Sequence, residues 1–165
     1  MLARHLLSIA ALPFTMTVLV PWWIARQDGV SFGVGDTPIA IVIQGAGIGV
    51  LLIGLTLFVA SLRQFIVRGR GTLAPWDPPT HLVVEGPYRY VRNPMISGVL
   101  FIVSGEAMVL LSSAHGVWAL IFFLINVTYI PISEEPGLRQ RFGRSYDEYC
   151  ANVGRFIPRL TPWSG

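Results

Sequence analysis

Apolar residues along this chain gather into four long runs, which polar, proline-rich or arginine-rich connectors separate. Each run is close to the roughly 20 residues that an α-helix needs to cross the hydrocarbon core of a bilayer. The pattern predicts an all-α, multi-pass membrane protein with about four transmembrane helices. The predicted spans lie near Leu6–Ala25, Pro38–Leu62, Met95–Leu111 and Val117–Ile132.

The first run follows Arg4, as the apolar region of a secretory signal peptide follows a basic residue. Its apolar stretch is long, however, and Trp22 and Trp23 at its end are typical of a membrane interface. No small-residue cleavage site stands out. We therefore interpret the first run as a transmembrane helix.

Runs three and four are separated only by Ser112–Gly116, so they are expected to form a helical hairpin. A polar motif, Gly86–Gly98, overlaps the start of this hairpin, and a second polar cluster, Ser133–Leu138, follows its end. The hairpin brings the two clusters face to face. This boundary between polar and apolar sequence is where we expect the function to lie.

The remaining connectors are also informative. Gly69–Pro79 is dense in helix breakers, so it predicts a structured connector. In the tail, Leu138, Phe142, Tyr146 and Tyr149 recur at three- and four-residue spacing. This spacing predicts one amphipathic helix from Glu135 to Tyr149 on the cytoplasmic side.

Composition supports the membrane interpretation. Only 13% of the residues are charged, against about 25% in an average soluble domain, so the lipid bilayer is the expected partner. All twelve basic residues are arginines, which suit carboxylates, phosphates and lipid headgroups. They cluster beside the apolar runs and not along a soluble face, so no nucleic-acid partner is expected.

Residues that bind metals or form disulfides are sparse. His5, His81 and His115 are too scattered for a recognisable metal site. Cys150 is the single cysteine, so it has no intramolecular disulfide partner and is interpreted as an incidental thiol. The sequence predicts no metal site.

The arginines also predict the orientation in the membrane. Five lie between runs two and three and five follow run four, whereas only Arg26 lies in the other long loop. The positive-inside rule then places both termini in the cytoplasm, which an even number of crossings requires. A short chain whose basic residues are all arginine favours a bacterial inner membrane, and residues 1–165 read as a single domain.

The motif Gly-Pro-Tyr-Arg-Tyr-Val-Arg-Asn-Pro-Met-x-x-Gly at 86–98, followed by an apolar hairpin and Glu134-Glu135-Pro136, carries a resemblance to a known family. With Phe142-Gly143 and Arg155–Arg159, the order is similar to the isoprenylcysteine carboxyl methyltransferase and phospholipid methyltransferase superfamily. The resemblance covers the C-terminal half, about residues 82–160. It implies a multi-pass membrane enzyme that uses S-adenosylmethionine as methyl donor.

The resemblance also implies where the cofactor binds and which residues are catalytic. The implied catalytic residues are Arg92, Glu134 and Glu135. The implied cofactor-binding residues are Tyr90, Arg92, Asn93, Pro94, Gly98, Glu134, Glu135, Tyr146, Tyr149 and Arg155.

The chemistry of these side chains suits that cofactor. Arg92 or Arg89 can bind its carboxylate through a two-pronged contact. Glu134 or Glu135 can accept hydrogen bonds from its ribose hydroxyls or amino group, or act as the base for an amine acceptor. Adjacent glutamates on a helix point about 100° apart, so one is expected to face the ligand and the other solvent or an arginine of the tail.

Two departures from the family pattern bear on the substrate. Asn93 stands where isoprenylcysteine methyltransferases usually have histidine, and Ile96 stands where both groups have tyrosine. The acceptor therefore remains open among an isoprenylcysteine-like carboxylate, a phospholipid amine and a thiol. A non-catalytic membrane scaffold, or a degenerate member of the family, is the alternative.

Two further features lie within the apolar runs. Glu106 is the only acidic residue inside a predicted span, where a charge is costly and usually functional. It is expected to contact the acceptor or to hydrogen-bond Asn126 or Tyr129 of run four. The glycines of Gly45–Gly49 either approach the cofactor or let neighbouring helices pack closely.

Overall fold

A computed structural model describes residues 10–30, 33–69 and 80–164. Within these ranges the chain forms helices and loops and contains no strand. The elements are the π-helix η1 (Ala10–Leu19), α2 (Val20–Gln27), α3 (Pro38–Gly69), the 3-10 helix η2 (Gly86–Arg89), α4 (Pro94–Val109), α5 (Ser113–Tyr129), the π-helical turn η3 (Ile130–Glu134), α6 (Glu135–Phe142) and α7 (Arg144–Asn152).

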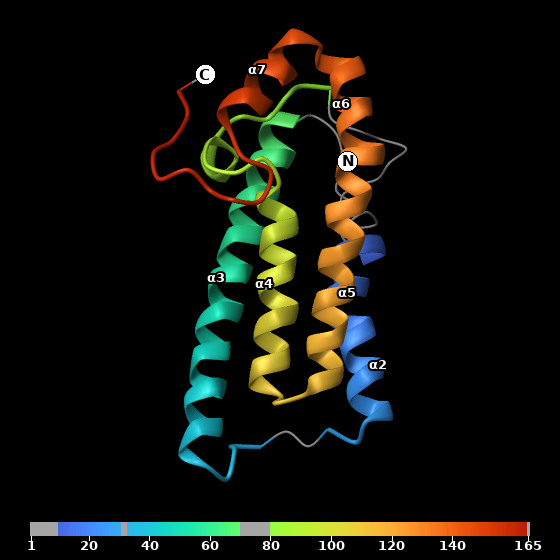
Figure 1. The fold of residues 1–165 in the computed structure, drawn as a ribbon, viewed down its shortest axis with the longest axis vertical. Coiled ribbons are helices and arrows are strands. Elements are labelled where there is room, and N and C mark those ends of the chain that lie inside the picture. Colours follow the sequence, from blue (N-terminus) through green and yellow to red (C-terminus); the bar gives the residue numbers. More distant parts are fainter. Residues whose placement is uncertain (1–9, 31–32, 70–79, 165) are drawn as a thin grey trace.

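Three long helices, α3, α4 and α5, stand side by side, and η1 and α2 pack against the bundle beside α4 and α5 (Figure 1). In the part of the chain that the structure describes, two helices are long and apolar enough to cross a membrane, Pro38–Arg68 and Ser113–Phe142. Only 11% and 17% of the residues in their most apolar windows are buried within the protein. The core helix of a soluble protein would be mostly buried, so these outward-facing apolar side chains fit a lipid surrounding.

The apolar runs predicted the helix positions well and their ends less well. Run two continues as α3 seven residues past Leu62, to Gly69, and run three appears as α4, a shorter apolar helix. The start of run one and nearly all of the Gly69–Pro79 connector lie outside the described residues.

Helix η1 contains Pro13, which has no N–H to donate within a helix. The chain here is wound as a π-helix, and π-helical turns are wider than α-helical ones. The Thr17 hydroxyl donates to the Pro13 carbonyl at 2.8 Å.

Helices α3 and α4 are held close together by glycines. A Cβ atom built at Gly98 would lie 2.8 Å from the Phe58 nitrogen, and one at Gly54 would lie 2.7 Å from the Ile102 nitrogen. Gly47 and Gly105 repeat the arrangement further along the two helices. Backbone therefore packs directly on backbone along an antiparallel seam.

The predicted hairpin of runs three and four is present as α4 and α5 (Figure 1). Leu111 turns the chain with φ +48°, and Ser112 caps α5 by accepting from the His115 N–H at 3.3 Å. The buried His115 ring then contacts Ser112 Oγ at 2.8 Å and the Pro21 carbonyl at 3.1 Å. This ring ties the hairpin to α2.

The tail is not one helix, and the prediction of a single amphipathic helix from Glu135 to Tyr149 was wrong in this respect. Gly143, with φ +53°, separates α6 from α7. Glycine adopts this left-handed backbone without the steric cost that a side chain brings. Helix α6 instead continues α5 through η3, and α7 folds back over the end of the bundle (Figure 1).

A small hydrophobic core lies at this end of the bundle. Tyr146, Tyr149 and Val153 are its buried centre, and Leu138 and Trp163 are among the residues packed around them. The core joins α6, α7 and the C-terminal segment. It provides a rigid support for the polar residues at the ends of α4 and α5.

Candidate functional site

The C-terminal segment brings the two polar clusters into one structure. It runs back along residues 89–92, where the Arg92 N–H donates to the Gly154 carbonyl at 2.8 Å and the Arg159 N–H donates to the Tyr90 carbonyl at 2.9 Å. The Trp163 N–H likewise donates to the Arg89 carbonyl at 3.0 Å. These bonds fix the start of α4 against the end of the chain.

Glu135 stands at the centre of the site and is bound by two arginines. Arg155 Nε donates to Oε1 at 2.7 Å and Arg155 Nη2 to Oε2 at 2.9 Å, while Arg92 Nη1 donates to Oε1 at 3.0 Å. The Glu135 side chain is only 4% exposed, against 11% for Arg92 and 33% for Arg155. We call these three residues the ion-pair cluster. A bidentate arginine–carboxylate contact of this kind is among the strong interactions of proteins.

The charge of the cluster is fixed. The hydrogen bond to Glu135 raises the pKa of Arg155, although partial burial opposes this shift. An arginine is protonated at any physiological pH in any case. Two positive charges therefore meet one negative charge here, which leaves the cluster with a net positive charge.

Arg92 has a hydrogen-bond donor that its protein partners do not use. One of its terminal nitrogens, Nη1, contacts both Glu135 and the Cys150 sulfur, the latter at 2.7 Å. Its Nε is buried and has no hydrogen-bond partner among the described residues. A buried donor without an acceptor is costly, so this N–H suits an acceptor supplied by a ligand.

Glu134 takes the other orientation. It ends η3 and its side chain is exposed, whereas Glu135 begins α6 and faces the arginines. The offset of about 100° between neighbouring helical residues accounts for this difference. Glu134 is thus the carboxylate that lies outside the ion-pair cluster.

The start of α4 holds the other predicted residues of the first motif. Asn93 is the N-cap position of α4, and its Nδ2 donates to the Arg155 carbonyl at 3.2 Å. Pro94 is buried in the first helical turn, and Tyr90 is partly exposed. Gly98 lies one turn further along, in the seam against Phe58 of α3.

Tyr146 and Tyr149 are both buried in the core beneath the cluster. The Tyr149 hydroxyl donates to the Tyr88 carbonyl at 2.7 Å. Burial raises the pKa of Tyr149, and the neighbouring Tyr88 adds to the shift. Burial also raises the pKa of Tyr146, next to Cys150. Both phenols are therefore neutral and support the site from below.

Sequence reasoning missed the position of Cys150. The sequence indicated an incidental thiol, but in the structure this thiol is in contact with Arg92. It lies four residues after Tyr146 on α7, so the same helical spacing that identified the tyrosines places it near the cluster. Arg89, in contrast, donates its Nε to the Trp163 carbonyl at 2.6 Å and so ties down the C-terminal segment.

The expected hydrogen bond of Glu106 to run four is not formed by its Oε2, which is buried and has no partner among the described residues. Asn126 donates to the Phe122 carbonyl instead. Among the residues that the structure describes, no three histidine, cysteine or acidic side chains group as metal ligands would.

Comparison with known families gives one match. The model of the phospholipid methyltransferase family matches residues 42–145. The match extends from α3 through Arg92 and both glutamates to the start of α7, and it ends before Tyr146, Tyr149 and Arg155. No curated protein and no solved structure matches the chain.

Proposed function

The chain belongs to the phospholipid methyltransferase family, and from this premise we propose that it transfers a methyl group from S-adenosylmethionine to a hydrophobic or amphipathic acceptor at the membrane. The observation that carries the proposal is the ion pair of Arg92 with Glu135, the neighbour of Glu134, at one end of the α4–α5 hairpin. These residues lie more than 40 positions apart in the sequence, and the ion pair of Arg92 with Glu135 joins them.

The donor set fits the proposed cofactor. S-adenosylmethionine carries a carboxylate, and the buried, unpartnered Nε of Arg92 is a donor that such a group would satisfy. We assign the ammonium or ribose hydroxyls to Glu134, because its carboxylate lies outside the ion-pair cluster. We assign further cofactor contacts to Tyr90, Asn93 and Pro94 at the start of α4 and to Arg155. Gly98 is packed against α3, and the buried Tyr146 and Tyr149 support the site from below.

Glu135 then has a positioning role. Because Arg155 and Arg92 already bind both of its oxygens, it holds the two guanidinium groups in place and does not itself reach the cofactor. This division of roles explains why the sequence carries two adjacent glutamates.

The proposed reaction requires little covalent chemistry from the side chains of the protein. The cofactor, when bound, supplies an electrophilic methyl group on a positively charged sulfur. The side chains of the site align the acceptor with it and exclude water. An amine acceptor must also lose a proton, and we assign Glu134 as the base that takes it. A carboxylate or thiolate acceptor needs no base, and an arginine would orient it.

We also propose that the chain crosses the membrane four times, with both termini in the cytoplasm of a bacterial cell and the site at the inner membrane's cytoplasmic face. The end of α3, the start of α4 and the end of α5 meet at the end of the bundle that carries α6 and α7 (Figure 1). Helix α4 is about 24 Å long, slightly short for a hydrocarbon core of roughly 30 Å. Arg92 and its neighbours are thereby kept near the interface.

Equilibrium binding of S-adenosylmethionine to the detergent-purified protein tests the proposal. The Glu134→Gln variant removes the proposed ligand carboxylate, and Glu148→Gln on the exposed face of α7 is the matched control. We expect binding to weaken at least about tenfold in Glu134→Gln, a loss of about 1.4 kcal/mol, and to remain unchanged in the control. A well-folded wild-type protein that binds no cofactor would refute the proposal.

One observation favours the alternative of a non-catalytic scaffold. Glu135 is fully paired by arginines of its own chain, so the ion-pair cluster is stable without a ligand. In a scaffold, substitutions at Arg92 would change stability alone. In the enzyme that we propose, Arg92→Lys, which keeps the charge and removes Nε–H, loses cofactor affinity while the protein stays folded.

A further inference from the structure

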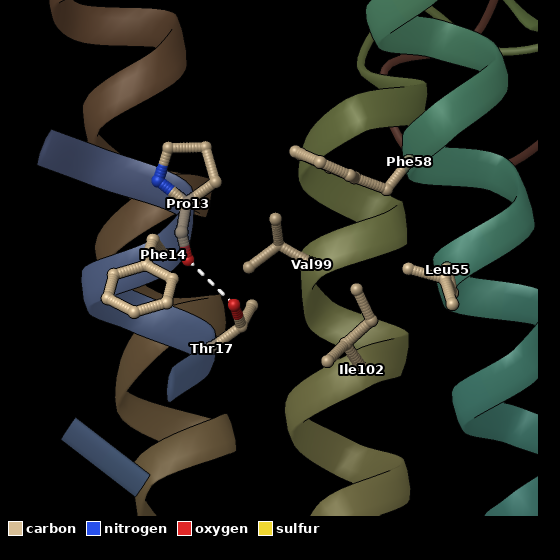
Figure 2. A pocket seen from close by; sticks show the side chains of 7 residues that line it. All are labelled: Pro13, Phe14, Thr17, Leu55, Phe58, Val99 and Ile102. Carbon is tan, nitrogen blue, oxygen red and sulfur yellow. Dashed lines mark hydrogen bonds between the residues drawn. The ribbon is translucent and has the colours of Figure 1, made fainter. Parts of the chain in front are cut away.

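A cavity lies inside the membrane part of the bundle, between η1 on one side and α3 and α4 on the other (Figure 2). Its volume is about 180 Å³, and its lining is almost entirely apolar: Pro13, Phe14, Thr17, Leu55, Phe58, Val99 and Ile102. The Thr17 hydroxyl is already bonded to the Pro13 carbonyl. The cavity therefore presents hydrocarbon surface and little unsatisfied polar capacity.

The arrangement of the helices explains why space remains here. Gly54 and Gly98 draw the backbones of α3 and α4 together, and Leu55 and Val99, the next residue of each helix, line the cavity beside that seam. Figure 2 shows Phe14 on η1 across the gap from Val99 and Ile102. The wide winding of η1 at Pro13 faces the same space.

The cavity has a closed floor and an open rim. Val99 at its floor is 3% exposed, whereas Phe14 and Leu55 at its rim are 44% and 46% exposed. In a protein that crosses the membrane, this rim faces acyl chains and not water. A hydrocarbon chain can therefore enter sideways from the bilayer.

The volume of the cavity limits which molecules can occupy it. An engineered cavity of roughly 150 Å³ with a similar apolar lining holds one benzene molecule, so the space here suits a segment of a single hydrocarbon chain. Val99, which lines the cavity, follows Arg92 by about two helical turns, so the cavity lies near the candidate site. An acceptor whose headgroup is presented to the cofactor at this end of the bundle would place its hydrocarbon chain at this cavity.

We propose that this cavity binds one hydrocarbon chain of the methyl acceptor and so makes the enzyme selective for amphiphiles over soluble acceptors with the same headgroup. The part of this inference that concerns acceptor selectivity rests on the proposed methyltransferase function. Binding of a hydrocarbon chain in the cavity can be measured without any catalysis.

The test compares two tryptophan substitutions on α3. Leu55→Trp fills the rim of the cavity. Leu52→Trp is the matched control, because Leu52 is also exposed on the same helix, at 55% against 46% for Leu55, but does not line the cavity. Neither residue belongs to the proposed cofactor site. Both variants are checked for unchanged S-adenosylmethionine binding.

The binding probe is a palmitate analogue with a diazirine in mid-chain, cross-linked to the purified protein in lipid nanodiscs. We expect labelling of Pro13–Thr17 and Leu55–Phe58 that unlabelled palmitate competes away, and that Leu55→Trp lowers about tenfold. Competition by S-farnesylcysteine, lysophosphatidylethanolamine and two-chain phosphatidylethanolamine then distinguishes the prenyl and acyl sources of the chain. Labelling that no single-chain amphiphile displaces, or that Leu55→Trp leaves unchanged, would overturn the proposal.

The kinetic arm uses long-chain and short-chain acceptors with one headgroup. Leu55→Trp is expected to raise KM for the long-chain acceptor about tenfold and to leave the short-chain reaction unaltered. Equal effects on both acceptors would overturn the proposal. If the wild-type protein binds no S-adenosylmethionine, the methyltransferase function fails, while the cross-linking result still decides whether the cavity holds a chain.

Discussion

Arg155 binds Glu135 through two parallel hydrogen bonds of 2.7 and 2.9 Å, although the residues are 20 positions apart in the sequence. The contact fastens the C-terminal segment to the start of α6, and the Glu135 oxygen that accepts from Arg155 Nε also accepts from Arg92. One carboxylate therefore joins three parts of the chain at the candidate site.

The first prediction concerns the stability that this carboxylate provides. Glu135→Ala leaves Arg92, 11% exposed, without its anionic partner, and removing one member of a buried ion pair costs about 3–5 kcal/mol. Thermal unfolding in detergent measures the loss. Asp147→Ala breaks the exposed Arg139–Asp147 pair and is expected to cost no more than about 1 kcal/mol. Equal, small shifts in both variants would contradict the buried role of Glu135.

The second prediction concerns alkaline pH. Burial raises the pKa of Tyr149 above its ordinary value of about 10. A raised folded-state pKa means that the stabilisation is fully present below the ordinary value and is lost as pH rises from it toward the folded-state pKa. The melting temperature should therefore fall as pH rises above about 10.

Tyr149→Phe tests this assignment, because phenylalanine keeps the ring but cannot ionise. At neutral pH it loses the hydrogen bond to the Tyr88 carbonyl, worth about 1 kcal/mol. Above about pH 10 its melting temperature should decline less steeply than that of the wild type. Parallel curves for the two proteins would show that Tyr149 does not contribute to the alkaline loss.

The third prediction concerns Gly98, which the motif assigned to the cofactor and which the fold places against α3. A Cβ atom there would meet the Phe58 nitrogen at 2.8 Å and the Gly54 carbonyl oxygen at 3.0 Å. Gly98→Ala should therefore destabilise the protein by about 1–3 kcal/mol, as overpacking does.

Gly45→Ala is the control for this experiment, since a Cβ atom at Gly45 meets nothing within 4 Å. The control should melt at or slightly above the wild-type temperature. If Gly98→Ala instead keeps the wild-type melting temperature and loses S-adenosylmethionine affinity, Gly98 contacts the cofactor and the seam tolerates a methyl group.

Much of this fold follows from sequence patterns that act locally. Apolar runs identified the helices, and the short Ser112–Gly116 connection identified the α4–α5 hairpin. The pairing of Glu135 with an arginine of the tail follows from helical geometry, since neighbouring residues cannot face the same side.

The features that the sequence did not reveal depend on contacts or on backbone conformation. The spacing of Leu138, Phe142, Tyr146 and Tyr149 fits one helix, but the φ of +53° at Gly143 breaks it, and periodicity does not report a backbone angle. The partner of Gly98 is equally hidden, because it lies on a helix that precedes α4 by more than 20 residues. Which arginine binds Glu135 could not be predicted without knowing the path of the C-terminal segment.

The last prediction separates the two ends of the bundle. His115 is buried between Ser112 and the Pro21 carbonyl. It lies in the first turn of α5, and α5 starts at the end of the bundle opposite to α6 and α7 (Figure 1). His115→Ala removes both hydrogen bonds and leaves Pro21 and Ser112 without this partner, so it should lower stability by about 2 kcal/mol. Ser113→Ala, at the exposed start of α5, should leave the melting temperature unchanged. Because His115 touches nothing in the ion-pair cluster, S-adenosylmethionine affinity measured below the melting transition should equal that of the wild type. A loss of affinity without a loss of stability would mean that the far end of the hairpin is coupled to the site, and the cofactor contacts proposed above would then need a different arrangement.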